Sequence, residues 1–136
     1  MKNEARNEIT GYPSIDRPWL KYYSDEAKEA KIPECTIYDY LWESNREHLD
    51  NVALNYFGYK IPYRKMFEEI NKVAQAFANL GIKEGDTIII AAVTIPEVIY
   101  VFYALNQLGA ISNMVDPRTS ERGIQKYIFC LLYTSD

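Results

Sequence analysis

The sequence predicts an α/β fold with a β-hairpin and a parallel β–α–β unit. Residues 87–93, TIIIAAV, are β-branched and apolar on both faces, which is typical of a strand covered on both sides. Before this run, apolar residues recur every three or four positions over residues 64–80, the period of an amphipathic helix. After it, Pro96 and Glu97 favour a helix start, because proline suits the first helical position and a carboxylate suits the positive end of the helix dipole.

Composition narrows the class of protein before any motif is considered. The chain has 136 residues, 48% apolar and 25% charged, which suits one modest globular domain. Its formal net charge of −4 argues against a general nucleic-acid binder, which needs an excess of Lys and Arg. The polar start, MKNEARNEIT, lacks the apolar segment of a secretory signal, and Cys35 and Cys130 form no CxxC pair. We therefore expect a cytoplasmic protein.

The N-terminal region shows no regular period. Residues 1–10 are polar, so we expect them to be mobile. Residues 11–23, GYPSIDRPWLKYY, are rich in proline and aromatic residues and predict an extended segment laid across a surface. The side chains expected to anchor this segment are Trp19, Leu20, Tyr22 and Tyr23.

A helix is predicted from Thr36 onward. Thr36 and Asp39 form a near capping box, with Asp where Glu or Gln is usual. The apolar stripe of this helix consists of Ile37, Tyr38, Leu41, Trp42 and Leu49. His48, the only histidine, lies on or beside the stripe and is interpreted as a packed or half-exposed helix residue. No nucleophile motif and no metal-ligand spacing accompanies it.

A hairpin and a long helix follow. Residues 52–57 alternate faces, and Gly58 is expected at the first position of a tight hairpin loop. The helix over residues 64–80 has an apolar face of Met66, Phe67, Ile70, Val73, Ala74, Phe77 and Leu80, and Gly81 is expected to end it. Glu68 and Glu69 are assigned to a solvated face, because adjacent helical carboxylates do not converge on one point.

The glycines of residues 81–87, GIKEGDT, have a different role from those of a phosphate loop. They are four residues apart, and Gly85 precedes Asp86-Thr87 where a phosphate loop has Lys followed by Ser or Thr. No GxGxxG motif occurs in the sequence. The segment is therefore interpreted as a turn that leads into a strand.

The run at residues 87–111 contains one ionisable side chain, Glu97, and is too interrupted for a membrane span. A span needs about 20 apolar residues in continuous helix, and Pro96-Glu97 divides the run early. We predict a strand, a helix from Pro96 to about Leu108 ended by Gly109, and a second strand over residues 110–115. Such a unit has parallel strands and a right-handed crossover. The helix is apolar almost all round, so it should pack against more than the sheet.

The last predicted element is a helix over residues 121–129, capped by Thr119 or Ser120 after the turn DPRTS. A parallel sheet is normally covered on both faces and contains more than two strands. The sheet predicted here therefore looks incomplete.

Taken in order, these elements resemble the N-terminal end of the AMP-forming adenylating enzymes, the acyl-CoA synthetases and their relatives. The resemblance covers about residues 12–128. It is carried by Tyr63-Arg64 at the start of the long helix, Leu80-Gly81-x-x-x-Gly85-Asp86, the apolar strand, Pro96-Glu97, Gly109-Ala110 and Asp116-Pro117-Arg118. It implies an incomplete N-terminal part of the large domain of an adenylate-forming enzyme. Pro62 stands where the family usually has Thr or Ser, and VTIPE replaces a more usual Pro-Asn-Ser-Pro-Glu.

The family's catalytic motifs are absent from this sequence. It has no Ser/Thr- and Gly-rich phosphate loop ending in Pro-Lys, no Tyr-Gly-x-Thr-Glu stretch, no Gly-Asp ribose contact and no C-terminal catalytic Lys. Without donors aimed at the developing charge, most of the electrostatic catalysis is missing. We therefore assign no catalytic, cofactor-binding or metal-binding residue. The resemblance implies ATP, Mg²⁺ and CoA for the full-length enzyme, and none is expected to bind this chain alone.

Three functional hypotheses follow. In the first, the chain belongs to a ligase that activates a carboxylic acid, expected to be a fatty acid, with ATP to an acyl-adenylate and transfers it to CoA. In the second, it is a short non-catalytic protein that binds a partner through its open sheet edge. In the third, it is part of an adenylation domain that loads a carrier protein. In every case the chain itself is predicted to be inactive.

The C-terminal residues are considered separately from the rest. Residues 129–136, FCLLYTSD, do not continue the family pattern and resemble translated sequencing adaptor. We expect them to be a non-native tail. The predicted organisation is thus a mobile segment over residues 1–10, a partial adenylating domain over residues 11–128, and the tail.

Overall fold

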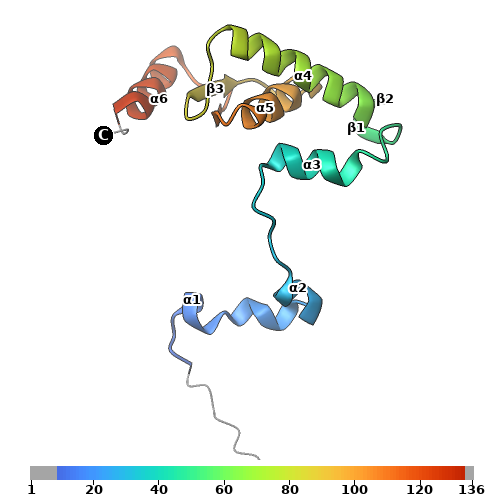
Figure 1. The fold of residues 1–136 in the computed structure, drawn as a ribbon. Coiled ribbons are helices and arrows are strands. Elements are labelled where there is room, and N and C mark those ends of the chain that lie inside the picture. The colour runs from blue at the N-terminus through green and yellow to red at the C-terminus, as the bar shows by residue number, and fades with distance from the viewer. Residues whose placement is uncertain (1–8, 134–136) are drawn as a thin grey trace, which may run out of the picture. The chain divides into compact units, whose positions relative to one another are not determined.

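A computed structural model describes residues 9–133 of the chain (Figure 1). The chain divides into two compact units, Met1–Glu34 and Cys35–Asp136. The division falls inside the predicted segment 11–128, so the N-terminal arm is a unit of its own. The boundaries predicted after residues 10 and 128 stay predictions.

The first unit is built from single helical turns, and the prediction of an extended segment is wrong. Its elements are α1 (Pro13–Asp16), the 3₁₀ helix η1 (Pro18–Tyr22) and α2 (Asp25–Glu29). Pro13 and Pro18 each occupy the start of a helix, where a fixed φ and a missing N–H cost nothing. One-turn helices have no repeating apolar face, so no period reveals them in the sequence.

Side-chain hydrogen bonds stabilise α1 and α2. The Asp16 carboxylate accepts hydrogen bonds from the Thr10 N–H at 2.9 Å, the Thr10 hydroxyl at 2.8 Å and the Gly11 N–H at 2.9 Å. These donors hold the pKa of Asp16 below its usual value. Ser24 caps α2 by accepting from the Ala27 N–H. None of these helices has a buried residue, and Trp19, Tyr22 and Tyr23 are exposed, so their role as anchors stays a prediction.

The second unit begins with α3 (Ile37–Asn45). The predicted cap is confirmed in part: the Thr36 hydroxyl accepts from the Asp39 N–H at 3.0 Å. The Asp39 carboxylate accepts from the Thr36 hydroxyl instead of reaching back to the backbone as in a capping box. The helix ends before His48, which is exposed in the turn that follows, so the prediction that His48 is a helix residue is wrong.

A second cap reaches α3 from a distant helix. The Asn106 side-chain oxygen accepts a hydrogen bond from the Tyr38 N–H at 2.8 Å. The Tyr38 hydroxyl donates to the Asn71 side-chain oxygen, which also accepts from Gln107. Phe67 packs edge-on against Tyr38 and Trp42, with ring centroids 6.1 and 4.9 Å away. Since Tyr38 is the only buried residue of α3, these few contacts set where the helix lies.

The Asn106 cap yields a stability prediction. Asn106→Ala leaves an N–H in the first turn of α3 without its partner, which costs about 1 kcal/mol of unfolding free energy in comparable helix caps. Asn79→Ala is the matched control, because Asn79 lies exposed at the end of another helix and the intrinsic helix propensity changes equally. Urea unfolding of both variants measures the difference, and equal stability would show that the cap contributes nothing.

The predicted hairpin is confirmed, with one correction to its loop. Strands β1 (Val52–Tyr56) and β2 (Tyr59–Pro62) pair antiparallel. The two-residue loop is Phe57-Gly58, so Gly58 takes the second position and not the first. Both loop residues have positive φ, 49° and 89°, as a type I′ turn requires.

The long helix α4 (Tyr63–Asn79) has the predicted apolar face. Met66, Phe67, Ile70 and Ala74 are buried, whereas Leu80 is 77% exposed and does not belong to the face. Gly81, at φ 88°, ends the helix. Its N–H donates to the Ala78 carbonyl and the Ile82 N–H to the Phe77 carbonyl, the two hydrogen bonds of a Schellman motif.

The polar face of α4 carries an ion-pair cluster. Glu69 accepts from Lys65 at 2.7 Å and from Lys72 at 2.9 Å. Glu68 is exposed and converges with no second carboxylate, as predicted. Hydrogen bonds from Lys65 and Lys72 lower the pKa of Glu69 from 4.5 to about 2. The cluster is structural, because both lysines are neutralised within their own helix.

Acid should therefore destabilise the chain partly through Glu69. A carboxylate with a depressed folded-state pKa contributes its full stability above the unfolded pKa, 4.5, and loses it as the pH falls towards about 2. We expect Glu69→Gln to be less stable than the unmodified chain at pH 6 and to approach it at pH 2.5. Glu68→Gln serves as control. A constant difference between Glu69→Gln and the unmodified chain over this range would contradict the assignment.

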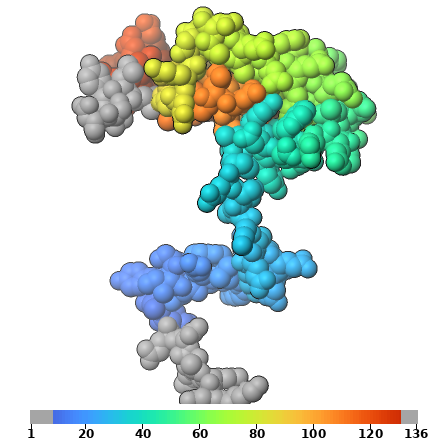
Figure 2. Space-filling view, viewed as in Figure 1, coloured from blue at the N-terminus to red at the C-terminus, as the bar shows by residue number. Residues whose placement is uncertain are grey.

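The predicted β–α–β unit is confirmed. Strands β3 (Thr87–Ala91) and β4 (Ile111–Val115) pair in parallel, with Thr87 opposite Ile111 and Ala91 opposite Val115. Helix α5 (Pro96–Gln107) connects them, beginning at Pro96 as predicted. It packs against α3, α4 and β4, as its all-round apolar character predicted. The space-filling view shows α4 lying against α5 (Figure 2).

None of the helices within residues 9–133 has the length and apolar character that a bilayer span requires.

The sheet is covered on one face within the described chain. Ile90 is buried in a cluster with Val98, Leu105 and Ala110, and Ile88 packs on the same cluster. Side chains alternate along a strand, so Ile89 points to the opposite face, where it is only half-buried. Among the described residues β3 and β4 pair only with each other. The double-sided cover that the sequence predicts is therefore not supplied by residues 9–133.

The last helix, α6 (Glu121–Tyr133), begins where predicted. The Ser120 hydroxyl accepts from the Gly123 N–H, which selects Ser120 over Thr119 as the cap. The helix continues past residue 129 to Tyr133, while residues 134–136 lie outside the described residues. The expectation that residues 129–136 are non-native stays a prediction.

Candidate functional site

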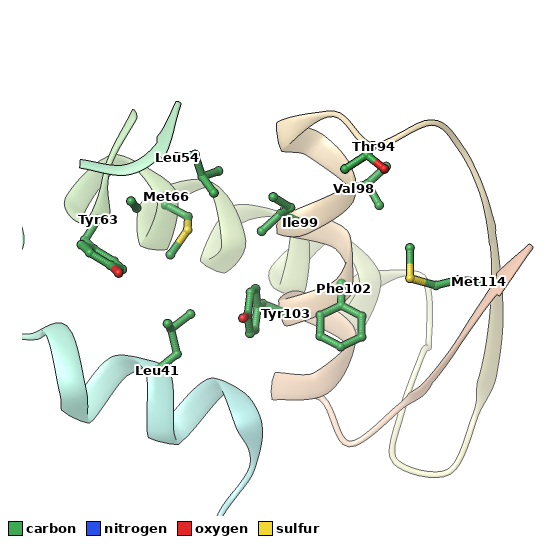
Figure 3. A pocket seen from close by; sticks show the side chains of 11 residues that line it. Leu41, Leu54, Tyr63, Met66, Thr94, Val98, Ile99, Phe102, Tyr103 and Met114 are labelled. Atoms are coloured by element: carbon green, nitrogen blue, oxygen red, sulfur yellow. The ribbon is translucent and has the colours of Figure 1, made fainter. Parts of the chain in front are cut away.

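An apolar groove lies between α3, the hairpin, α4 and α5 (Figure 3). We call it the α3–α5 groove. Its volume is about 390 Å³, and it is lined by Leu41, Ala53, Leu54, Tyr63, Met66, Thr94, Val98, Ile99, Phe102, Tyr103 and Met114. The figure shows side chains of α3, β1 and α4 on one side and those of α5 on the other, with Met114 beyond Phe102.

The groove follows from how α5 is placed. Buried Val98 anchors this helix to the sheet, and buried Tyr100 and Ala104 join it to the core that α4 shares. Ile99, Phe102 and Tyr103 project from the remaining side, where they are only partly buried. A helix that is apolar all round thus leaves one apolar strip without full cover.

The chemistry of the groove is simple. No acidic or basic side chain lines it, and its polar side-chain atoms are the hydroxyls of Tyr63, Thr94 and Tyr103. Such a surface can bury apolar groups, but it offers no charge to hold a phosphate or a carboxylate. No sequence pattern predicts the groove, because its walls come from segments far apart in the chain.

A second hollow lies at the carboxyl ends of β3 and β4. It has a volume of about 590 Å³ and is lined by Ala92, Val93, Thr94, Met114, Val115, Asp116, Pro117 and Arg118. Ligands of open α/β sheets commonly bind at this edge. Thr94 and Met114 line both hollows, so the two surfaces are continuous.

The charged groups of this second hollow neutralise each other. The Arg118 guanidinium donates to both carboxylate oxygens of Asp116, at 3.0 and 2.7 Å. The backbone N–H of Arg118 also donates to one of these oxygens, at 2.9 Å. These contacts lower the pKa of Asp116 and raise the pKa of Arg118. An exposed, already paired carboxylate of this kind is a poor general base. The pair is best explained as a contact that stabilises the turn in which both residues lie.

The segment GIKEGDT is a turn that leads into β3, the interpretation made from the sequence. The Lys83 N–H donates to the Asp86 carboxylate at 2.9 Å, and the Asp86 N–H donates to the Lys83 carbonyl. The Gly85 N–H donates to the Gly109 carbonyl at 3.0 Å. Backbone amides that would have to face a phosphate are thus committed within the fold.

Metal-ligating side chains are scattered over the described residues. Residues 9–133 contain no cluster of three or more His, Cys, Asp and Glu side chains that could hold a metal. Cys35 and Cys130 are both exposed and His48 stands apart in a turn. No step of a reaction is therefore assigned to a residue of this chain.

Comparison with known proteins identifies the family. Residues 41–128 match the sequence model of the family described as AMP-binding enzyme. That match spans more than half of the chain, and the chain belongs to this family. An acetyl-coenzyme A synthetase of Alcanivorax borkumensis is 30% identical over 100 residues, which are 71% of this chain and 14% of that protein. The long-chain-fatty-acid–CoA ligase of Bacillus subtilis is 23% identical over 110 residues, 80% of this chain and 20% of the ligase.

Solved structures agree on the fold. The N-terminal subdomain of NpsA from Klebsiella oxytoca, in complex with anthranilyl-AMSN, matches with a TM-score of 0.67 and 26% identity, over 79% of this chain and 27% of that one. An artificially fused NpsA–ThdA adenylation–PCP di-domain matches with a TM-score of 0.67 and 28% identity, over 69% of this chain and 18% of that one. The fold is thus that of an N-terminal part of the adenylate-forming domain, and the chain spans a fifth or less of the two curated relatives.

Proposed function

We propose that this chain is the N-terminal part of a cytoplasmic ligase that activates a carboxylic acid, of the fatty type, and transfers its acyl group to CoA. In the first half-reaction the carboxylate displaces pyrophosphate from ATP and becomes an acyl-adenylate. In the second, the CoA thiol attacks the acyl carbon, loses its proton, and AMP leaves. The family match over residues 41–128 is the observation that carries the proposal.

The role proposed for the described residues is structural. Helices α4 and α5 form the core, the hairpin and α3 pack against it, and β3–α5–β4 forms one unit of a parallel sheet. Groups that bind ATP phosphates, Mg²⁺ and CoA would come from other parts of the polypeptide, since the sequence has none of the family's motifs for them. The chain alone is then inactive.

Product analysis tests the acceptor. The longer protein that includes this chain is incubated with ATP, Mg²⁺, CoA and a panel of short, long and aromatic acids. We expect an acyl-CoA and AMP to form in equal amounts, and we expect the acid with the largest yield to be a fatty acid. Failure to form acyl-CoA with every acid would contradict the CoA-ligase proposal.

A carrier protein is the second candidate acceptor. The observation that favours it is the fold match to an adenylation–PCP di-domain and to the NpsA subdomain. With a phosphopantetheinylated carrier protein in place of CoA, the carrier would then become acylated, whereas the incubation with CoA would form no acyl-CoA. This outcome would keep acid activation and replace the acceptor.

A further inference from the structure

The α3–α5 groove has the character of an internal contact surface left uncovered. Eleven residues from at least five segments form it, and none is acidic or basic. Met114 is 58% exposed although it lies on strand β4. Partly exposed apolar side chains that gather in one hollow, and are not scattered singly, make that hollow a candidate contact surface.

The surroundings of the groove also favour a contact surface. Through Thr94 and Met114 the groove continues into the hollow at the carboxyl ends of β3 and β4, where the Asp116–Arg118 ion pair lies. An apolar centre with a polar rim is the normal anatomy of a stable protein contact. A neutral centre also excludes a charged ligand as occupant, since burying an unpaired charge there would be costly.

The comparisons indicate what covers it. The NpsA N-terminal subdomain is a structure in its own right, and this chain spans only 27% of it. Most of that compact subdomain thus has no counterpart within the 136 residues. Every lining residue of the groove lies within residues 41–128, the part of the chain that matches the family model.

We infer that the α3–α5 groove is the surface on which the remainder of the adenylate-forming domain, a part of the longer polypeptide outside these 136 residues, packs its own apolar side chains. The inference rests on the proposed function, since it requires a longer chain. Beyond the proposed function, the inference gives the location of the contact. This location is the α3–α5 groove, which is continuous with the carboxyl ends of β3 and β4. Small apolar molecules and second copies of the chain are the competing occupants.

Thiol labelling tests this inference directly. Thr94→Cys introduces a thiol of similar size in the groove, and Met114→Cys provides a second position if the first variant does not fold. Gln75→Cys is the matched control, because Gln75 is exposed on the polar face of α4. Each variant is made in the 136-residue chain and in the longer protein, and maleimide labelling of the new thiol is followed by peptide mass spectrometry.

The inference predicts fast labelling of the Thr94→Cys and Met114→Cys thiols in the short chain and labelling slower by about tenfold or more in the longer protein, because a buried thiol reacts only through local opening. The Gln75→Cys thiol should react equally in both. Equal rates at the groove positions, slow labelling already in the short chain, or the absence of a longer reading frame would each overturn it. Protection by decanoic acid alone, or by raising the short-chain concentration alone, would identify a competing occupant and also overturn it.

This experiment separates the inference from the proposed function. Protection in a protein that forms no acyl-adenylate rejects the enzymatic activity and keeps the contact. Adenylate formation without protection keeps the activity and rejects the contact.

Discussion

Leu105→Ala is expected to lower the unfolding free energy of the chain by about 2–5 kcal/mol, the range for emptying a buried leucine site. Leu105 is 0% exposed in the last turn of α5 and packs with Ile90, Val98 and Ala110. It therefore joins the helix to the sheet, and no neighbour can fill the space without moving one of them. Domains of this size are stable by only about 5–15 kcal/mol, so the loss is a large fraction of the total.

Leu80→Ala is the matched control for this prediction. Leu80 is 77% exposed at the end of α4, and its truncation should change stability by less than about 0.5 kcal/mol. Urea unfolding followed by tryptophan fluorescence measures both variants in the 136-residue chain. Losses of similar size for the two leucines would mean that the β3–α5 cluster is not the core described here.

Gly109→Ala is the second substitution with a large expected effect. Gly109 has φ 72°, where a residue with a Cβ loses about 1–2 kcal/mol. A Cβ there would also approach the Glu84 Cγ to 3.0 Å and the Glu84 Cβ to 3.2 Å. The strain and the contact act together at the point where the chain turns from α5 into β4.

Gly81→Ala separates these two causes. Gly81 has φ 88° in the equivalent position after α4, and a Cβ there meets no atom within 4 Å. It should show the conformational cost alone, so Gly109→Ala should be the less stable variant. The same urea titration compares them, and a Gly81→Ala chain that unfolds first would contradict the contact with Glu84.

The elements with a strong local signal were predicted from the sequence. The hairpin, α4, β3, α5 and β4 all lie within a residue or two of their predicted bounds, because apolar period, proline and glycine act locally. The turns at α1 and η1 were missed for the converse reason, since a single helical turn has no period. Leu80 fits the α4 period but lies beyond its buried part, where packing and not pattern decides exposure.

Long-range features could not be predicted in this way. Asn106 caps α3 across 68 residues of sequence, and nothing near Asn106 or Tyr38 signals that contact. The α3–α5 groove likewise depends on the relative placement of helices and strands. No catalytic, cofactor-binding or metal-binding residue was assigned from the sequence, and that assignment stays a prediction.

The measurement that bears most directly on the function is acid-dependent exchange of pyrophosphate into ATP, compared between the 136-residue chain and the longer protein that contains it. We expect exchange by the longer protein with at least one carboxylic acid and none by the short chain, because the family's phosphate-loop and catalytic-lysine motifs are absent from the 136 residues. Exchange by the short chain would contradict its structural role. No exchange by the longer protein with any acid of a broad panel would contradict the proposed enzyme.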